Sequence, residues 1–295
     1  MFGIGTEPII SLSIEGWTLR VMETRGRRIV MWANIPLSSE LIREGLVADA
    51  NGLGKIIGET FKAGGLSKRR VVCAVNVPHA VPRMFTVPKD QGANLAKVVD
   101  REIHRQLPAA KEDSFVYWQA VEGKSQTLQH IYLLTVPKEP LLMMLTSLKV
   151  AGVRPYSMDL RTLALARSIN QKDAILANLE ANTADVVISV NDIPVFMRSV
   201  SLGEEPAPTT VAQTRLLSEL NRTLSFYNDT NRANPLASAV PIFLTGELAG
   251  DSDLVQPVED LTGHPVSVLN PPMEYPPDFP GNQFMVNIGL ALKEL

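Results

Sequence analysis

Residues 10–21 read ISLSIEGWTLRV, and residues 175–186 read ILANLEANTADV. Placed over each other with a shift of 165 positions, the two stretches are identical at Ile10/Ile175, Glu15/Glu180, Thr18/Thr183 and Val21/Val186. Each consists of an apolar run, a polar turn and a second apolar run, which is typical of a β-hairpin. Both continue through another turn into a third apolar run, where Leu37 faces Leu202. The sequence therefore predicts a three-strand meander that occurs twice.

Helices and strands alternate between and after the two meanders. Amphipathic patterns and stop signals predict helices at residues 51–63, 94–106, 140–151, 160–169, 210–227 and 284–292. Apolar runs predict further strands at residues 70–76, 83–87, 115–121, 127–135 and 242–246. This alternation is typical of α/β proteins. We expect two α/β halves, each opening with the same meander, and a ligand in the cleft between them.

Composition limits the classes of function. The 295 residues include 28 Lys and Arg against 31 Asp and Glu, a net charge of -3, so the chain has no basic excess to neutralise nucleic-acid phosphates. The single cysteine, Cys73, excludes an intramolecular disulfide framework. No uncharged apolar stretch reaches the ~20 residues that cross a bilayer, and the start lacks a signal-peptide pattern. We expect a cytoplasmic protein that has no membrane span and does not bind nucleic acid.

Several short motifs accompany the meanders in a fixed order. They are NIPL at 34–37, VPHAVPR at 77–83, AGVRP at 151–155, DLRTLALAR at 159–167, PVFMRS at 194–199, LTG at 244–246 and IGLAL at 288–292. In this order and spacing the chain resembles the actin/Hsp70-type ATPase superfamily. Within it the chain resembles the PilM family of type IV pilus assembly proteins, which are relatives of the FtsA cell-division proteins. The resemblance covers nearly the whole sequence.

The resemblance implies an actin-like, duplicated two-lobe α/β fold with an inserted α+β subdomain of the FtsA/PilM type. The first lobe would comprise residues 1–82, 152–172 and 282–295, and the inserted subdomain residues 83–151. The second lobe would comprise residues 173–281, with a helical region at about 204–235.

The resemblance also implies a nucleotide site between the lobes, in which both hairpin turns surround the phosphates of ATP. The matching positions in this sequence are Ser13, Glu15, Gly16, Thr18, Asn178, Glu180, Thr183, Gly246 and Glu247. Backbone N–H groups that approach a polyanion require glycine, so that no side chain intervenes. A carboxylate usually helps to hold the Mg²⁺ ion and its waters.

This sequence departs from that pattern in all three turns. The family has Asp-apolar-Gly in both hairpins, and this chain has SIE at 13–15 and NLE at 178–180. The family's Gly-Gly turn at the adenosine reads Gly246-Glu247. Each carboxylate beside a phosphate would repel it by about 1–4 kcal/mol. We predict a lost or strongly weakened ATP site, and hence a pseudo-ATPase without a resident cofactor or metal.

Two alternatives keep an ATP–Mg site open. A one-residue shift of the alignment would bring Gly16 to the phosphate, and a glutamate could bind Mg²⁺ in place of the missing aspartate. The chain would then be an active ATPase whose nucleotide state controls partner binding. A small-molecule kinase of the same superfamily is disfavoured, because the sequence supplies no aspartate general base beside a glycine-rich loop.

The resemblance implies a partner as well. PilM-family proteins lie on the cytoplasmic face of the inner membrane and hold the N-terminal tail of a PilN-like single-span membrane protein, in a groove beside the inserted subdomain. No short motif marks the groove residues. We therefore predict a cytoplasmic adaptor of a pilus or related secretion machine, whose helix at 210–227 could serve self-association.

Overall fold

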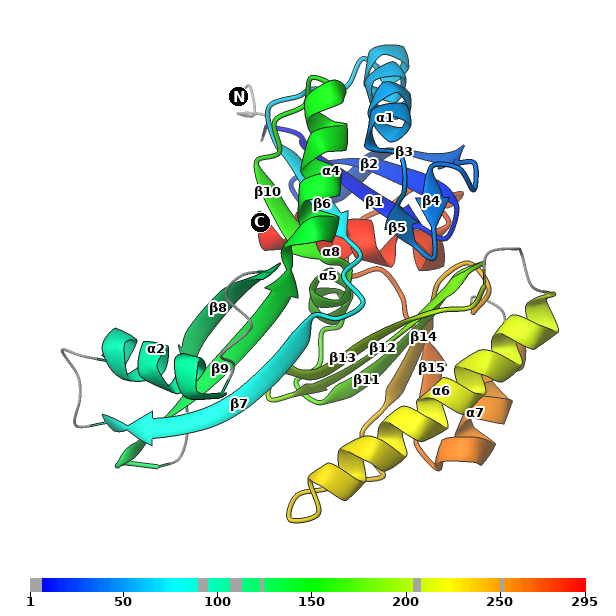
Figure 1. Ribbon diagram of the computed structural model, residues 1–295. Helices are drawn as coiled ribbons and strands as arrows, with labels where there is room; N and C mark the ends of the chain where they lie inside the picture. The colour runs from blue at the N-terminus through cyan, green and yellow to red at the C-terminus, as the bar shows by residue number, and fades with distance from the viewer. Residues whose placement is uncertain (1–6, 90–94, 107–112, 123–124, 204–207, 250–251) are drawn as a thin grey trace, which may run out of the picture.

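Two five-stranded sheets organise the molecule into two lobes, one above the other in Figure 1. The computed structural model describes residues 7–89, 95–106, 113–122, 125–203, 208–249 and 252–295. A three-stranded sheet and helix α2 (Leu95–Gln106) project from the side of the lobes. The chain ends in the first lobe, where its last helix packs.

The first meander forms the edge and centre of the first sheet. Its antiparallel strands are β1 (Ile9–Glu15), β2 (Thr18–Arg25) and β3 (Arg28–Pro36), and β6 (Val71–Val75) and β10 (Ser157–Leu160) continue the sheet in parallel. The strand order is β10-β6-β1-β2-β3. Every residue of β1 and β6 is buried, which explains why both strands are apolar or small as far as Glu15, the last residue of β1.

The second sheet repeats this topology. Its strands are β11 (Ala174–Leu179), β12 (Thr183–Val190), β13 (Ile193–Ser201), β14 (Ile242–Thr245) and β15 (Val266–Val268), in the order β13-β12-β11-β14-β15. Again three antiparallel strands are followed by two parallel ones. Each meander also has one irregularity in the pairing of its second and third strands, after Glu23 and after Ile188, which are 165 positions apart.

Individual hydrogen bonds repeat with the same shift. The N–H of Leu37 donates to the carbonyl of Trp17 at 2.7 Å, and the N–H of Leu202 donates to the carbonyl of Asn182 at 2.7 Å. These bonds close the third strand of each meander onto its hairpin turn. The predicted duplication is therefore confirmed in strand order, register and turn geometry.

Four helices pack on the first sheet. They are α1 (Ala50–Gly64), α4 (Lys138–Val150), α5 (Arg161–Ser168) and α8 (Met285–Lys293). The Asp49 carboxylate caps α1 by accepting from the N–H groups of Asn51 and Gly52, and Gly65 ends it with a left-handed φ of 60°. Helices α1 and α4 lie side by side, and α5 crosses α8 beneath the sheet (Figure 1).

The second lobe is covered by α6 (Thr209–Thr230) and α7 (Val255–Thr262). Helix α6 buries Leu216, Leu220 and Leu224 against the second sheet. Residues 204–207 of the expected helical region lie outside the described residues. Helix α7 and strand β15 were not predicted, because they have only eight and three residues and Pro257 interrupts the helical pattern.

Other short elements of the described chain are β4 (Ile42–Arg43), β5 (Leu46–Val47), η2 (Ser252–Leu254) and η3 (Gly281–Phe284).

The projecting unit has its own small core. It consists of β7 (Val81–Pro88), α2 (Leu95–Gln106), β8 (Ser114–Val121) and β9 (Leu128–Pro137), with the strand order β7-β9-β8. The buried residues of this small core are Val87, Val99, Ile103, Ile131 and Leu133. Residue 94, where we predicted the helix to begin, lies outside the described residues. We call this unit, residues 81–137, the inserted sheet.

The packing departs from the predicted domain limits at α4. The predicted subdomain, residues 83–151, includes this helix, but Met144 and Leu148 are buried with Leu53 and Ile57 of α1 in the first-lobe core. The two helices approach closely, since a Cβ on Gly54 would lie 2.5 Å from the carbonyl oxygen of Ser147. The apolar stripe of α4 thus belongs to the first lobe. The other predicted limits stay a proposal.

Candidate functional site

The turns of the two hairpins meet between the lobes. Pairing of Glu15 with Thr18 closes the first turn, in which Gly16 has a φ of 60°. A Cβ on Gly16 would lie 3.5 Å from the amide nitrogen of Ala181 and 3.6 Å from Oδ1 of Asn182, both in the second turn. The first turn therefore faces the backbone of the second turn.

An ion pair joins the lobes at this point. Arg20 on β2 donates from Nη1 to Oε1 of Glu180 at 2.9 Å and from Nη2 to Oε2 at 2.7 Å. Both side chains are only 1% exposed. Arg20 also donates to the carbonyl of Gln283, and its guanidinium lies 3.6 Å from the carboxylate of Glu247, which is 45% exposed. A two-bond Arg–carboxylate contact of this kind fixes orientation as well as distance.

A second ion pair lies beside the first. Arg161, at the start of α5, donates from Nη2 to Oδ1 of Asp185 on β12 at 2.8 Å. The Asp185 carboxylate also accepts from Nδ2 of Asn178 at 3.0 Å and from the hydroxyl of Ser199. The Nη1 atom of Arg161 lies 3.8 Å from Oε2 of Glu15. Arg161 therefore connects the second sheet to the first hairpin turn.

These charges occupy matching positions in the two repeats. Arg20 and Asp185 are 165 positions apart, as are Glu15 and Glu180. The repeat thus carries a glutamate in each turn but opposite charges on the following strand. Arg20 of the first copy compensates Glu180 of the second, and Arg161 lies between Asp185 and Glu15.

Glu15 is a buried carboxyl group of this site that lacks hydrogen-bond partners among the described residues. Both of its oxygens are buried and make no hydrogen bond within the described part of the chain. Burial raises the pKa of Glu15 to about 8, against the opposing effect of Arg161. When Glu15 is protonated, Arg20 and Arg161 face the carboxylates of Glu180 and Asp185, so the positive and negative charges of these buried side chains balance. Burial also raises the pKa of Glu180, while its contacts with Arg20 oppose that shift.

Most residues of the predicted phosphate site are occupied by other contacts. The hydroxyl of Ser13 donates to Oδ1 of Asn287 on α8 at 2.8 Å, and Asn178 is bound to Asp185. Thr18 lies in the ladder between β1 and β3. The hydroxyl of Thr183 is buried and makes no hydrogen bond among the described residues.

Gly246 is required by packing. Its φ is 100°, and a Cβ would lie 2.4 Å from the carbonyl oxygen of Leu179 in the second hairpin. The close approach is therefore between two protein backbones. Gly246 and Glu247 line a pocket of about 370 Å³ with Tyr275, Phe279 and Gln283.

This arrangement does not fit a magnesium–phosphate group between the turns. Ser13, Glu15, Asn178 and Glu180 are each at most 2% exposed, so a phosphate at that position would have to displace protein atoms. Within the described ranges, no three His, Cys, Asp or Glu side chains are placed to hold a metal ion together. Sequence reasoning missed Arg20, Arg161 and Asp185. The available signal was the alignment itself, which set Arg20 opposite Asp185, each two residues after the matching Thr18 and Thr183.

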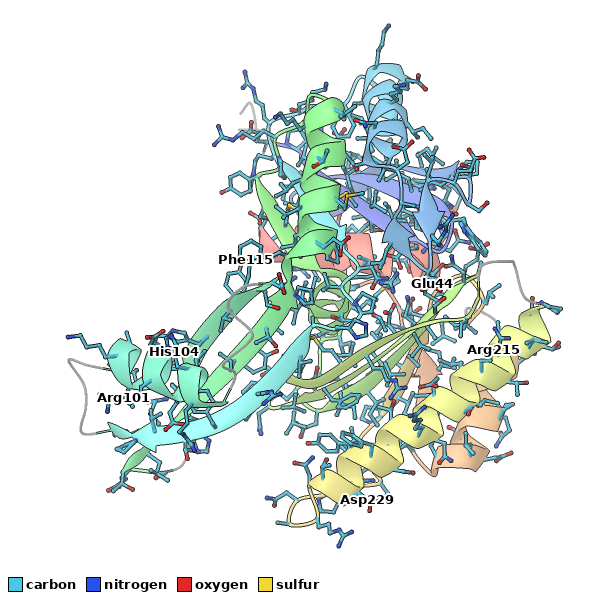
Figure 2. All side chains as sticks on the ribbon, viewed as in Figure 1. Glu44, Arg101, His104, Phe115, Arg215 and Asp229 are labelled. Carbon is cyan, nitrogen blue, oxygen red and sulfur yellow. The ribbon has the colours of Figure 1, made fainter. Side chains whose placement is uncertain are left out.

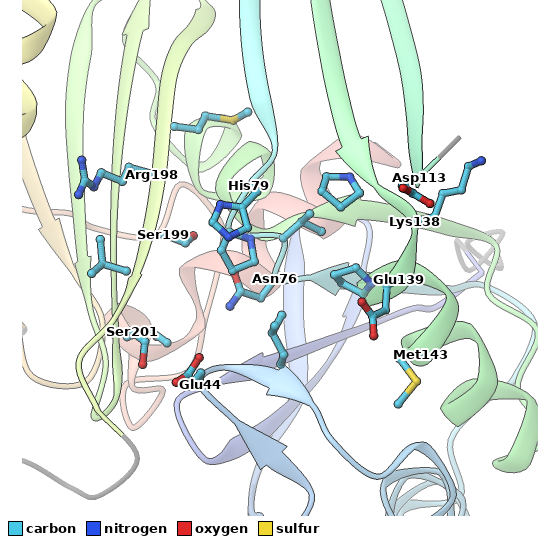
Figure 3. A pocket seen from close by; sticks show the side chains of 18 of the residues that line it. Glu44, Asn76, His79, Asp113, Lys138, Glu139, Met143, Arg198, Ser199 and Ser201 are labelled. Atoms are coloured by element: carbon cyan, nitrogen blue, oxygen red, sulfur yellow. The ribbon is translucent and has the colours of Figure 1, made fainter. Parts of the chain in front are cut away.

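A larger cleft of about 1370 Å³ opens elsewhere between the lobes (Figure 3). Its first-lobe side carries Glu44, Asn76 and His79, and β13 faces them with Arg198 and Ser199. The start of α4 closes another side of the cleft. Of the nine predicted site residues, Thr183 is the one that lines this cleft. Its lining mixes both signs of charge with apolar side chains.

A narrower groove of about 360 Å³ runs between the inserted sheet and the first lobe. Its lining is mostly aromatic and aliphatic, and consists of Val75, Tyr117, Trp118, Gln119, Tyr132, Leu134, Val136, Leu141, Met158, Asp159, Leu160, Leu163 and Lys293. Tyr117 and Trp118 on β8 are 54% and 37% exposed. At the polar end Asp159 is bound by Lys293 at 3.2 Å and by Arg167 at 3.0 Å. We call this cavity the β8 groove; it can bury apolar side chains of an extended segment.

No helix in the described part of the chain is long and apolar enough to span a bilayer. No protein-family model and no curated protein sequence matches the chain.

Solved structures do match it over nearly its whole length. A chain of the PilM–PilN type IV pilus biogenesis complex has a TM-score of 0.75 and 20% identity, covering 97% of this chain and 98% of that one. The cytoplasmic domain of EpsL, an inner membrane component of the type II secretion system of Vibrio cholerae, has a TM-score of 0.54 and 10% identity, covering 96% and 95%. MreB5 of Spiroplasma citri bound to ADP has a TM-score of 0.53 and 10% identity, covering 96% and 95%. The chain therefore has the actin-like two-lobe α/β fold that the sequence predicted.

Proposed function

We propose that this chain is a PilM-like cytoplasmic adaptor in pilus or related secretion machinery, held at the inner membrane by the N-terminal tail of a PilN-like single-span membrane protein. The full-length likeness to a chain of the PilM–PilN complex supports this proposal. The likeness to the cytoplasmic domain of EpsL supports a place beside a membrane component. The adaptor role does not require nucleotide turnover.

The β8 groove is the proposed binding site of the tail. It lies beside the inserted sheet, where we expect the partner from the PilM resemblance, and its wall of Tyr117, Trp118 and Tyr132 suits apolar side chains. Asp159 at its polar end is already paired with Lys293 and Arg167, so the groove demands no compensating charge from the tail. We therefore expect an extended segment that inserts apolar residues.

The ion pair between Arg20 and Glu180 carries the proposal that the ATP site is lost. A nucleotide phosphate between the turns would have to break two hydrogen bonds of 2.9 and 2.7 Å and to meet the carboxylate of Glu180. The chain thus uses its own side chains to join the lobes where the family uses a ligand. Breaking a buried ion pair leaves an uncompensated charge, which costs about 3–5 kcal/mol.

One observation favours an active ATPase as the second candidate. The pocket of about 370 Å³ at Gly246 and Glu247 lies at the turn that the resemblance assigns to the adenosine. Calorimetric titration with Mg-ATP separates the two candidates. We expect no saturable binding at sub-millimolar nucleotide, and micromolar affinity would overturn the proposed loss of the site.

Tryptophan fluorescence tests the tail-binding proposal. The probe is a synthetic peptide of the N-terminal tail of a single-span membrane protein encoded beside this chain's gene. We expect the peptide to shift the emission of Trp118 to shorter wavelength, because it covers an indole that is 37% exposed. A Trp118→Phe variant should lose the shift and a Trp32→Phe variant should keep it, since Trp32 packs on Phe279 at 5.3 Å, outside the groove. A shift that survives in Trp118→Phe and disappears in Trp32→Phe would exclude the β8 groove.

A further inference from the structure

The end of the first lobe that points away from the second lobe is formed by two connections. Helix α4 begins beside the interlobe cleft and finishes at the opposite end, from where residues 151–156 lead into β10. Helix α1 runs the same way, and residues 65–70 lead into β6. Strands β1 and β6 start side by side at this end, where Ile10 pairs with Val71. Strand β1 then runs to the hairpin turn between the lobes, so both connections lie far from the second lobe (Figure 1). We call residues 62–70 and 149–156 the distal end.

The distal end is strongly basic in a chain with a net charge of -3. Its sequences, KAGGLSKRR and KVAGVRPY, contain no Asp or Glu and six basic residues: Lys62, Lys68, Arg69, Arg70, Lys149 and Arg154. All of these except Arg70 are exposed, and Arg70 pairs with Glu294 at 3.9 Å. Nitrogen-tipped side chains project from this end of the molecule in Figure 2. Lys62 and Lys149 lie in the last turns of α1 and α4, where the helix dipole favours positive charge.

Local contacts hold these groups on one surface. The ammonium of Lys68 donates to the carbonyl of Ala151 at 2.8 Å and so ties the two connections together. Val150 and Tyr156 lie among the basic residues and are 44% and 60% exposed. The Tyr156 ring also packs under the guanidinium of Arg70, whose carbon lies 5.4 Å from the ring centre. The surface therefore combines fixed positive charge with exposed apolar and aromatic groups.

We infer that the distal end docks on the headgroups of an anionic phospholipid bilayer. Clusters of four to eight Lys and Arg bind anionic lipids, and each basic residue strengthens binding by about fivefold. Exposed Tyr and aliphatic side chains suit the headgroup region, which is amphipathic. Nucleic acid offers the same phosphate charge but gives the aliphatic Val150 no apolar surroundings. This contact goes beyond the proposed partner and does not depend on it.

Vesicle sedimentation with the full-length chain tests the inference. One set of vesicles contains equimolar phosphatidylglycerol and phosphatidylcholine, and the other contains phosphatidylcholine alone. We expect binding to the first set only, weakening as sodium chloride is added. Equal binding to both sets, or no binding to the anionic set at low salt, would overturn the inference. So would complete competition by inorganic phosphate at matched ionic strength, since that would indicate a site for a free anion.

Charge-neutral variants locate the contact. A variant with Lys62→Gln, Arg69→Gln, Lys149→Gln and Arg154→Gln should bind anionic vesicles several hundredfold more weakly, at about fivefold for each charge. Lys68 is left intact because its hydrogen bond is structural. The matched control carries Lys97→Gln, Arg101→Gln, Lys172→Gln and Arg232→Gln, and Figure 2 shows Arg101 on α2, far from the distal end. Equal losses in the two variants would show a general effect of net charge and contradict the assignment. Unchanged thermal unfolding confirms that both variants are folded.

Discussion

Arg20 of the first lobe and Glu180 of the second are bound to each other by two hydrogen bonds of 2.9 and 2.7 Å, with both side chains 1% exposed. The contact sits where the two copies of the meander bring their hairpin turns together. Both arginines of the site come from the first lobe, and Glu180 and Asp185, which pair with them, come from the second. The lobes are thus joined by charges that belong to the chain itself.

We predict that the Arg20–Glu180 pair contributes to stability only as a pair. Arg20→Met and Glu180→Met should each lower the free energy of unfolding by about 3–5 kcal/mol, because each leaves a buried charge without its partner. The double variant should recover part of this loss, giving a coupling energy of about 2 kcal/mol or more in urea unfolding.

The pair between Arg25 and Glu23 provides the control. Its atoms are 3.2 Å apart, but Arg25 is 62% exposed, so the same cycle should give less than about 1 kcal/mol. Additive losses at Arg20 and Glu180 would mean that the two charges do not depend on each other.

The stability of the fold should depend on pH through Glu15. Its ordinary pKa of 4.5 is raised to about 8 in the folded chain, so the folded state keeps a proton that the unfolded chain releases. The stabilisation is full below pH 4.5 and is lost as the pH rises through 8. Relative to wild type, Glu15→Gln should therefore gain stability over this range, by up to about 1.4 kcal/mol per pH unit. Urea unfolding of both proteins from pH 5 to 8 measures this difference. Parallel pH curves would show that Glu15 is ionised in the folded state.

Two helical glycines should respond in opposite ways to alanine. At Gly289 a Cβ would lie 1.8 Å from the carbonyl oxygen of Ala164, so Gly289→Ala must push α8 away from α5 and should cost about 3 kcal/mol or more. At Gly58 the nearest atom would be 3.5 Å away, and Gly58→Ala should stabilise α1 by about 0.5–1 kcal/mol. Thermal unfolding compares the variants. Similar melting temperatures for both would contradict the close crossing of α5 and α8.

Hydrogen exchange should separate the first-lobe core from the inserted sheet. Leu148→Ala and Leu133→Ala each remove a side chain that is at most 1% exposed and should cost about 2–5 kcal/mol. We expect Leu148→Ala to speed amide exchange in α1, and Leu133→Ala to speed it in β7, β9 and α2. Faster exchange in the inserted sheet of Leu148→Ala, with α1 unchanged, would return α4 to the subdomain that the sequence predicted.

Much of the fold followed from local pattern. The meanders were predictable because apolar runs, turn residues and a constant shift of 165 positions all agree. Helices α1, α5 and α6 followed from amphipathic periodicity, and their observed ranges lie close to the predicted ones. Helix α7 was missed because its eight residues are too few to establish a period.

The sequence predicted the altered turns of the candidate site but not the residues that pair with them. The replaced glycines and aspartates at Glu15, Asn178 and Glu180 were visible in the sequence, and they pointed to a disrupted phosphate site. The arginines that face Glu15 and Glu180 could not be identified from the sequence, because Arg161 is 146 positions from Glu15 and Arg20 is 160 positions from Glu180. Sequence spacing does not say which charges share a buried surface.

The sequence by itself determined the duplicated architecture, because a repeated order of apolar runs and turns forms the same sheet wherever it occurs in the chain. Only the tertiary structure decided how the copies meet. Burial of the two turns against each other excludes water, so their carboxyl groups must be paired or protonated, and Arg20, Arg161 and the raised pKa of Glu15 meet that requirement. The tertiary structure also formed the β8 groove between the inserted sheet and the first lobe, and it placed the basic distal end on the side of the first lobe that faces away from the second.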